Sequence, residues 1–196
     1  VGGQNVNLVG SGFRMEEFPN DLLVGSDFEE LRLLGVLLAV AADDGIAVRE
    51  SLTAAGLVIV SNYQYGKPGG TAPSDFTRGY AGGVADAKTG WQLHTAAGGG
   101  QSAPIFFSID DDISRDTWNT VALQWFRGIN SVLGVQRTGV YGGIDVCQWA
   151  VADGVIGNSG TPGRRWAWQT RAWSGKRVHP AAVLYQRIVS TASNPG

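Results

Sequence analysis

The chain has 196 residues and a formal net charge of −2, and 43% of its residues are hydrophobic, which is enough for the core of one domain. The nearly balanced charge excludes the strongly basic surface of a typical nucleic-acid-binding domain, and no apolar run reaches the roughly 18 residues of a membrane-spanning helix. A single cysteine, Cys147, excludes a disulfide within these residues and a cysteine-based metal site. We therefore expect no nucleic-acid partner, no membrane span, no metal and no cofactor.

From about residue 31 onward, short apolar runs alternate with patterns of helical period. The predicted strands are residues 36–40, 57–63, 104–110, 138–142, 165–169 and 182–186, and the predicted helices are residues 47–55, 74–87, 116–133 and 145–152. Alternation of this kind predicts a parallel sheet with right-handed crossovers. The 29 glycines are expected at the ends of these elements. No repeat or linker divides the chain, so residues 1–196 are interpreted as one domain.

Residues 104–112 have the sequence PIFFSIDDD, an apolar run that ends in three carboxylates. The run indicates a strand buried on both faces. Because side chains alternate across a strand, Asp110 and Asp112 are expected on one face, roughly 6.6 Å apart between Cα atoms, with Asp111 on the other. Two carboxylates this close do not both ionise cheaply, so one is expected to act as an acid beside a base. The alternative is an Asp-rich turn before the next helix, with Asp111 as the helix cap.

Polar side chains gather at the carboxyl ends of the predicted strands. Because parallel strands end at the same edge of a sheet, these side chains are expected to form one rim, as in a β/α barrel. A doubly wound sheet would also bind its ligand at this edge. However, no G-x-G-x-x-G motif follows the first strand and no P-loop motif occurs, so a nucleotide site is not expected. The rim residues are Asn62, Gln64, Asp110, Asp112, Tyr141, Gln169 and Gln186.

Five motifs occur in order along the chain: SNYQYG, PIFFSIDDD, RGINSVLG, RTGVYGG and RWAWQTRAWSGKR. Over residues 57–192 the chain resembles the actinobacterial glycoside-hydrolase-like domain family, which is related to a Tat-exported mycobacterial cell-envelope protein. The resemblance implies an irregular β/α barrel with a sugar-binding cleft, similar in outline to the family-twenty-five lysozymes that cut peptidoglycan. In those lysozymes the fourth strand ends in Asp-x-Glu, and Asp110 and Asp112 would occupy these two positions.

The first fifty residues fit this family pattern poorly. The lysozymes carry a further Asp at the end of the first strand, whereas residues 4–9, the candidate first strand, offer Asn5 and Asn7. The nearest carboxylates are Asp43 and Asp44. The chain also stops before the final strand that the family carries. The expected fold is therefore an irregular α/β barrel of the TIM type, either complete or incomplete, and an incomplete barrel would expose two strand edges.

A glycosidase needs two carboxyl groups that flank the scissile bond. Asp112, nearer the rim, is expected to be the proton donor, and Asp110, deeper in the barrel, is expected to stabilise positive charge at the sugar or to act as nucleophile. The estimated Cα spacing does not distinguish retention from inversion, because side-chain rotamers move the carboxyl groups by more than the difference. The expected sugar contacts, each with an ordinary structural role as its alternative, are Asn62, Gln64, Tyr65, Tyr141, Trp168, Gln169 and Gln186.

Several other polar and aromatic residues have less specific expectations. Tyr63 and Trp173 are expected near the same rim, and Trp166 in the core. His94 and His179 are expected in loops, because neither belongs to a nucleophile or metal motif. A basic cluster is interpreted either as a solvated loop or as a contact for an anionic cell-wall polymer; its members are Arg164, Arg165, Arg171, Lys176 and Arg177.

The residues and the resemblance together predict a glycoside-hydrolase-like protein that acts on cell-envelope polysaccharide by acid-assisted glycosidic hydrolysis, with peptidoglycan as the expected polymer. The alternative is a non-catalytic glycan-binding or envelope-assembly module on the same barrel. A monomer that is secreted or held in the cell envelope is expected. No export signal is visible, and the chain opens on Val1, so it is interpreted as a processed form or an excised domain.

Overall fold

The computed structural model describes the backbone of residues 36–38, and residues 60–70 and 72–186 with their side chains. Some sequence predictions lie outside these residues and stay predictions. They are the strand at 4–9, the helix at 47–55 and the carboxylates Asp43 and Asp44.

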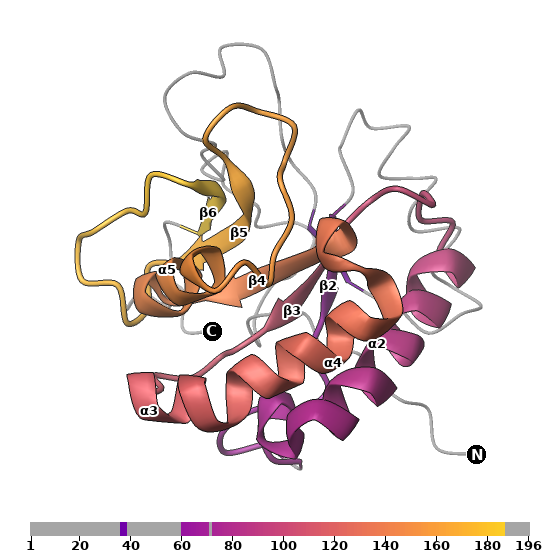
Figure 1. Ribbon diagram of the computed structural model, residues 1–196, viewed down its shortest axis with the longest axis horizontal. Helices are drawn as coiled ribbons and strands as arrows, with labels where there is room; N and C mark the ends of the chain where they lie inside the picture. The colour runs from indigo at the N-terminus through magenta and orange to yellow at the C-terminus, as the bar shows by residue number, and fades with distance from the viewer. Residues whose placement is uncertain (1–35, 39–59, 71, 187–196) are drawn as a thin grey trace, which may run out of the picture.

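Six strands form one sheet in the order β1-β2-β3-β4-β5-β6, and every neighbouring pair is parallel. The strands are β1 (Val36–Leu38), β2 (Val60–Tyr63), β3 (Ile105–Ser108), β4 (Thr138–Gly142), β5 (Arg165–Thr170) and β6 (Ala182–Gln186). Each strand overlaps a run that the sequence predicts as a strand, and the parallel order is confirmed (Figure 1).

Helices make the crossovers between β2 and β5. Their bounds are η1 (Asp75–Arg78, a 3-10 turn), α2 (Gly79–Ala96), α3 (Arg115–Thr117), η2 (Trp118–Ala122, a π-helical turn), α4 (Leu123–Leu133), η3 (Val135–Arg137, a 3-10 turn) and α5 (Ile144–Ala152). The helix predicted at 116–133 is confirmed as the series α3, η2 and α4. The helix predicted at 74–87 is placed correctly but is too short, because α2 continues to Ala96. Residues 171–181 join β5 to β6 without a helix.

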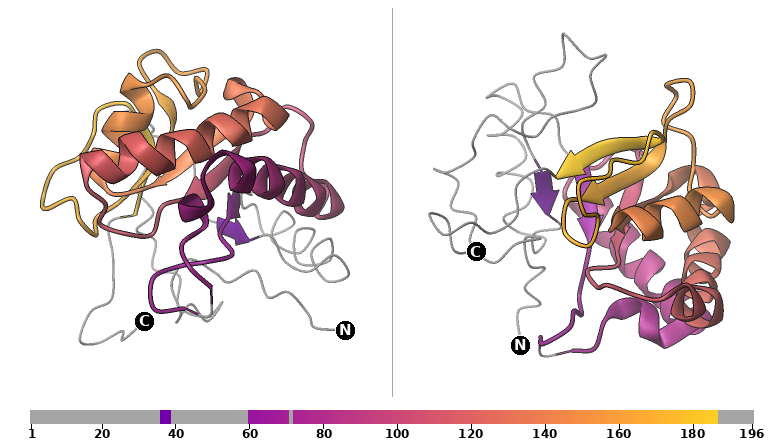
Figure 2. Two further views of the ribbon diagram at one scale, coloured as in Figure 1. Left: turned by 60° about the horizontal axis from the view of Figure 1, so that its bottom comes forward. Right: turned by 90° about the vertical axis from the view of Figure 1, so that its left-hand side faces the viewer.

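The two faces of the sheet are covered differently. On one face, Phe107, Val140 and Ala167 belong to a large core shared with α2, α4 and α5. Figure 2 shows these helices together on one side of the sheet. On the opposite face, side chains of the same strands form a second, smaller hydrophobic cluster, so the strands are apolar on both faces. Its buried members are Phe106, Tyr141, Trp168 and Leu184, and Trp166 packs against it as expected.

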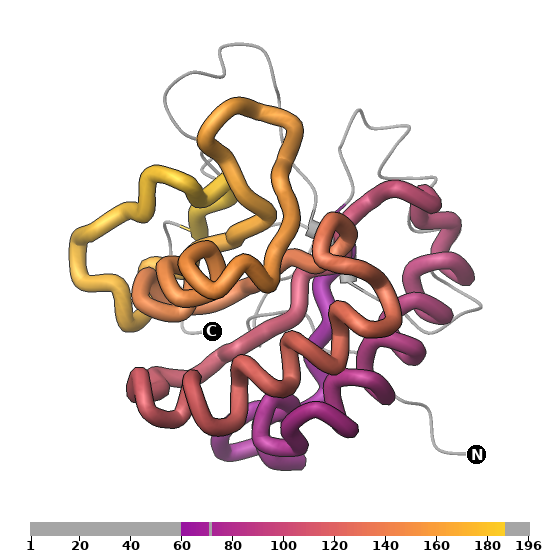
Figure 3. Tube along the Cα trace, in the orientation of Figure 1, coloured from indigo at the N-terminus to yellow at the C-terminus, as the bar shows by residue number. Residues whose placement is uncertain are grey.

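Glycines bring α2 and α4 into close contact, and Figure 3 traces the two helices side by side. A Cβ on Gly83 would lie 2.0 Å from Trp125 O, and one on Gly128 would lie 2.1 Å from Tyr80 O. Both positions therefore need a residue without a side chain. The expectation that glycines lie at the ends of elements is wrong for this helix pair, where they set the distance between the helix backbones.

The parallel strand order and the helix-covered face confirm an α/β fold with a curled sheet that forms part of a barrel. Within the described residues, β1 and β6 are the two edges of this sheet, and no strand pairing joins them. Closure into a complete barrel stays a prediction.

Candidate active site

The carboxyl ends of the parallel strands bring predicted rim residues to one edge of the sheet. Asn62 lies near the end of β2, and Gln64 directly follows that strand. Tyr141 is the fourth residue of β4, and Gln186 ends β6. Asp110 joins them from the turn after β3.

The carboxylates that follow β3 lie beyond the strand. β3 ends at Ser108, two residues before Asp110, so strand alternation does not govern Asp110 and Asp112. The expectation that they share one strand face is therefore wrong. Asp110 is half-buried and Asp112 is exposed. The cap expected at Asp111 is also wrong, because the Ser114 hydroxyl caps the next helix and accepts a 3.1 Å hydrogen bond from its backbone.

Two hydrogen-bonded pairs join β2 to β3 at this edge. Gln64 Nε2 donates to Asp110 Oδ2 at 3.3 Å. One step into the strands, Asn62 Nδ2 donates to Ser108 Oγ at 3.0 Å, and the same hydroxyl donates back to Asn62 Oδ1 at 3.2 Å. Ser108, which the sequence did not single out, thus satisfies a buried amide. Gln64 orients the Asp110 carboxylate, whereas the Asn62 amide is already occupied.

An aromatic group borders these pairs on the face away from the helices. The Tyr141 hydroxyl donates to Gln186 Oε1 at 2.6 Å, and the ring packs edge-on against Trp168 with 5.2 Å between centroids. Burial, and next the negative charge of Asp110, raise the pKa of Tyr141, so its hydroxyl stays a neutral donor. Trp168 Nε1 is buried and has no hydrogen-bond partner among the described residues. A carboxylate, a phenol and two amides therefore meet at one end of the sheet.

This geometry agrees with a match to a known family. The profile of the Rv2525c-like, glycoside hydrolase-like domain matches residues 47–196, well over half of the chain. The chain belongs to this family.

The Rv2525c-like chain is similar to Rv2525c of Mycobacterium tuberculosis, which is named as a proposed peptidoglycan hydrolase. The two are 45% identical over 136 residues, which are 69% of this chain and 52% of that protein. This chain therefore spans about half the length of the curated relative that it matches.

Two crystal structures of the Tat-secreted Rv2525c are also similar to the fold. The complex with L-tartrate has a TM-score of 0.64 and 42% identity, over 72% of this chain and 65% of that one. The complex with HEPES has a TM-score of 0.66 and 40% identity, over 77% of this chain and 70% of that one.

In this Rv2525c-like domain, Gln169 does not share a face with Tyr141. The register pairs Tyr141 with Trp168, which places the next residue, Gln169, toward the helix-covered face. Its buried amide donates from Nε2 to Arg177 O at 2.8 Å and accepts at Oε1 from His179 N–H at 2.7 Å. The expectation that Gln169 lies with Tyr141 in one rim is wrong, and its amide instead fixes the chain between β5 and β6.

The two tyrosines at the end of β2 point to different surroundings. Tyr63 is buried on the helix side, 5.7 Å from Phe107 between ring centroids, so its expected place near the rim is wrong. Tyr65 lies in the loop after β2 and is 54% exposed. Of this pair, only Tyr65 is in reach of a ligand.

A buried ionic network, which the sequence analysis missed, centres on Asp86 of α2. Its carboxylate accepts hydrogen bonds from Tyr63 Oη at 3.0 Å and Trp125 Nε1 at 2.8 Å. The Arg78 guanidinium donates to both of its oxygens, at 2.6 and 2.7 Å. The one signal in the sequence is an acidic residue amid the glycines and alanines of GYAGGVADA, a composition typical of a buried helix face.

A second buried carboxylate, Asp75, fixes the loop between β2 and α2. It accepts from the backbone N–H groups of Tyr65 at 2.8 Å and Gly66 at 3.0 Å, and from Arg78 at 3.0 Å. Burial is the main cause that raises the pKa of Asp75. The network holds the segment that carries Gln64 to the edge of the sheet.

His94 lies within α2 and is buried, so its expected loop position is wrong. Its Nε2 lies 2.9 Å from Gly100 O and its Nδ1 lies 2.7 Å from Ser61 Oγ. Because a carbonyl only accepts, we assign the proton to Nε2, and Nδ1 then accepts from the serine hydroxyl. This residue ties the end of α2 to β2 and does not face the candidate site. His179 lies in a loop as expected, and burial lowers its pKa.

Within residues 60–70 and 72–186, no group of three or more His, Cys, Asp or Glu side chains is placed to hold a metal ion. In that part of the chain, no helix combines the length and the apolar character needed to cross a membrane.

Proposed function

We propose that this chain is a glycosidase that cuts the glycan strands of peptidoglycan by acid-assisted hydrolysis. The family and the name of the mycobacterial relative support this proposal. The observation that carries it is the Asp110 carboxylate, which Gln64 holds at the carboxyl end of β3 close enough to raise the pKa of Tyr141. In β/α barrels this end of the sheet carries the catalytic groups.

In the proposed mechanism, Asp112 donates a proton to the glycosidic oxygen while Asp110 remains ionised beside the sugar ring. The exposed position of Asp112 lets it meet a polymer that arrives from solvent. Asp110 stabilises the positive charge of the oxocarbenium-like transition state or attacks the sugar carbon as a nucleophile. In either case water supplies the new hydroxyl group, and the leaving sugar keeps the proton from Asp112.

The proposed sugar contacts differ in how free their polar atoms are. Tyr141 and Gln186 form a hydrogen-bonded donor–acceptor pair. The Gln64 amide, which already faces Asp110, is placed to form a hydrogen bond with a neighbouring sugar hydroxyl. Tyr65 offers an exposed ring, and Trp168 lies behind Tyr141. Two predicted contacts have both amide atoms bound within the protein, which makes them the weaker candidates: Asn62 and Gln169.

The test is the release of new reducing ends from purified peptidoglycan. Asp112→Asn is expected to lower the rate by about 100-fold or more, the usual contribution of a general acid, with an unchanged circular dichroism spectrum. Asp111→Asn is the matched control, because it removes a carboxylate from the same turn and should leave the rate unchanged. Full activity in Asp112→Asn would rule out this residue as the acid.

A non-catalytic glycan-binding or envelope-assembly module is the second candidate. It is favoured by the exposure of Asp112, whose carboxylate has no hydrogen bond among the described residues, because catalytic carboxyl groups are usually oriented by neighbours. This candidate predicts that the wild-type chain sediments with peptidoglycan, or with its assembly partners, without releasing reducing ends.

We also infer a secreted or envelope location, supported by the Tat-secreted relative. We further propose that residues 1–196 form a single barrel domain. It works as a monomer and has polysaccharide as its partner.

A further inference from the structure

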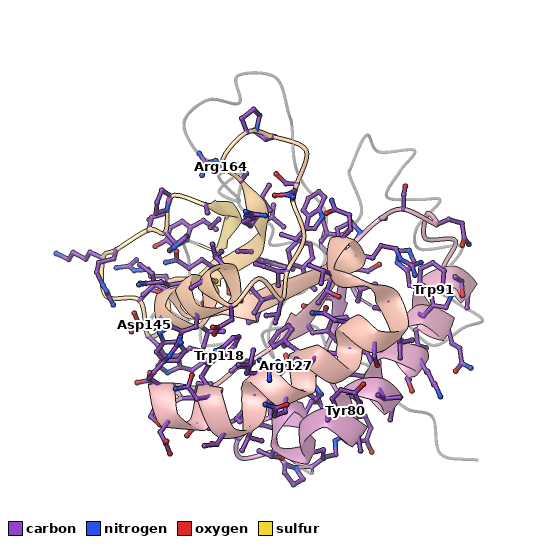
Figure 4. The ribbon with its side chains drawn as sticks, in the orientation of Figure 1. Tyr80, Trp91, Trp118, Arg127, Asp145 and Arg164 are labelled. Atoms are coloured by element: carbon purple, nitrogen blue, oxygen red, sulfur yellow. The ribbon has the colours of Figure 1, made fainter. Side chains whose placement is uncertain are left out.

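The segment that joins β5 to β6, residues 171–181, is here named the β5–β6 loop. It contains three basic residues, Arg171, Lys176 and Arg177, and no acidic residue, in a chain with a net charge of −2. It also exposes two large apolar side chains, Trp173 at 40% and Val178 at 53%. In Figure 1 it is the yellow segment at the left, and it passes Asp145, which Figure 4 labels. Exposed aromatic surface combined with one sign of charge is typical of a binding surface.

The first half of the β5–β6 loop lies at the candidate active edge. Arg171 N–H donates to Gln186 O at 2.9 Å, and the side chain of Gln186 binds Tyr141. Ser174 Oγ accepts from the N–H of Ile144, at the start of α5, at 2.9 Å. Trp173 therefore lies at the carboxyl edge of the sheet, beside Gly143 between β4 and α5.

Side-chain hydrogen bonds hold the loop in one conformation. Ser174 Oγ donates to Thr170 O at 2.5 Å, and the Gln169 amide bridges Arg177 O at 2.8 Å and His179 N–H at 2.7 Å. A loop fixed in this way loses little conformational entropy when a ligand binds to it.

Trp173 has a backbone φ of 56°, and it is the one non-glycine residue with positive φ among the described residues. A bulky side chain in this region costs free energy that glycine would avoid. The neighbouring backbone is also close, since a Cβ on Gly143 would lie 3.3 Å from Trp173 Cβ. Backbone strain of this kind concentrates at functional positions, and here it presents an indole ring to solvent at the edge of the site.

We propose that the β5–β6 loop is a subsite for carboxylate-bearing sugars, in which Trp173 stacks on a sugar ring and Arg171 and Lys176 bind the carboxylate. The proposal rests on the proposed function and deepens it, because it names acidic, muramyl-type strands as preferred over neutral ones. Charge complementarity supports this ligand, since neither cation has an ion-pair partner among the described residues, whereas Arg177 lies 3.5 Å from Asp145. Guanidinium pairs well with carboxylates, and aromatic rings suit amphipathic sugar faces.

The test separates binding from cleavage by using the Asp110→Asn/Asp112→Asn double variant as background. Its probes are soluble muramyl-peptide glycan strands, which carry carboxylates, and chitohexaose, which is neutral. Calorimetry is expected to show that Arg171→Glu/Lys176→Glu weakens binding of the muramyl strands by about tenfold and binding of chitohexaose by less than about twofold. Lys88→Glu, which reverses an exposed charge on α2, is the matched control and should change neither affinity.

Trp173→Gly tests the stacking role. It is expected to lower the affinity for both ligands by about tenfold. The melting temperature is expected to be maintained or raised, because glycine accepts the positive φ. Tyr80→Ala, which removes an exposed aromatic side chain from α2, should have no effect on binding.

Unchanged affinity in either loop variant, or the absence of saturable binding of muramyl strands to the background variant, would overturn the subsite. The proposed function is scored by reducing ends alone. If Asp112→Asn abolishes the release of reducing ends and the loop variants leave it intact, the proposed glycosidase activity stands and the proposed subsite is wrong. If the chain binds carboxylate-bearing strands selectively but the wild-type chain releases no reducing ends, the proposed subsite stands and the proposed glycosidase activity is wrong.

Discussion

The Tyr141 hydroxyl donates a 2.6 Å hydrogen bond to Gln186 Oε1, so β4 is tied to β6 across the intervening strand β5. The bond lies at the carboxyl edge of the sheet, on the face opposite α2, α4 and α5. The Tyr141 ring also packs against Trp168 of β5. One residue therefore connects three strands at the place where the polymer is proposed to bind.

Tyr141→Phe should lower the free energy of unfolding by about 1 kcal/mol, because the bond is lost and Gln186 keeps an unpaired acceptor that is only partly solvated. Urea denaturation followed by tryptophan fluorescence measures this change. Tyr65→Phe is the matched control, since its ring is exposed and its hydroxyl has no hydrogen bond among the described residues. Equal stability of the two variants would contradict a structural role for the Tyr141 hydroxyl.

Alkaline pH should reveal two tyrosines that do not ionise in the folded state. Burial is the main cause that raises the pKa of Tyr63 and Tyr141, with the charges of Asp86 and Asp110 as the next causes. Because these pKa values lie above the unfolded value of about 10, their stabilising contribution is complete below about pH 10 and declines as the pH rises further.

The check is the tyrosinate absorbance of folded protein. Up to about pH 11, Tyr63→Phe and Tyr141→Phe should each give the same absorbance rise as the wild-type chain, because the residue removed is one that stays neutral. A smaller rise in either variant before the protein unfolds would show that its phenol does titrate.

Asp86→Asn should lower the free energy of unfolding by about 2–3 kcal/mol. The buried Asp86 carboxylate accepts hydrogen bonds from three side chains, and the substitution removes its charge. Arg78, which is 45% exposed, limits the loss because it can turn toward solvent. Chemical denaturation measures the difference against Asp112→Asn, an exposed carboxylate whose removal should change stability by less than about 0.5 kcal/mol. Similar stabilities for the two variants would mean that the network contributes little.

Gly83→Ala should cost about 1–3 kcal/mol, because its new methyl group would lie 2.0 Å from Trp125 O and push α2 away from α4. Gly100→Ala is the control, since the nearest atom to its new Cβ is 3.9 Å away. Thermal unfolding of the two variants compares them directly. If Gly83→Ala melts at the wild-type temperature, the helices are not held at the distance described.

The sequence was sufficient to predict the parallel strand order because apolar runs and helical patterns alternate clearly. It could not predict where β3 ends, since the run PIFFSID is apolar beyond Ser108. That error placed Asp110 and Asp112 on one strand face. The extension of α2 to Ala96 was missed because WQLHTAAGGG looks polar, whereas His94 finds its partners in Ser61 and Gly100.

Most of the rim could be predicted because residues at the ends of parallel strands meet whatever their register. The sequence could not predict that Gln169 and Tyr141 lie on opposite faces, since this depends on how β4 and β5 pair. β5 also carries a register shift against β6 between Arg165 and Trp168. The buried Asp86 was missed for a similar reason. Its partners Tyr63 and Trp125 are distant in sequence, and only the folded chain brings them together.

Mass spectrometry of the soluble products formed when the chain is incubated with purified peptidoglycan tests the proposed hydrolysis. Muropeptides with new reducing ends are expected from the wild-type chain and from Asp111→Asn, and their rate of release is expected to fall by about 100-fold or more in Asp110→Asn and in Asp112→Asn. Release at the wild-type rate by either of the latter variants, or a wild-type chain that sediments with the polymer and releases nothing, would contradict the proposed hydrolysis by this pair.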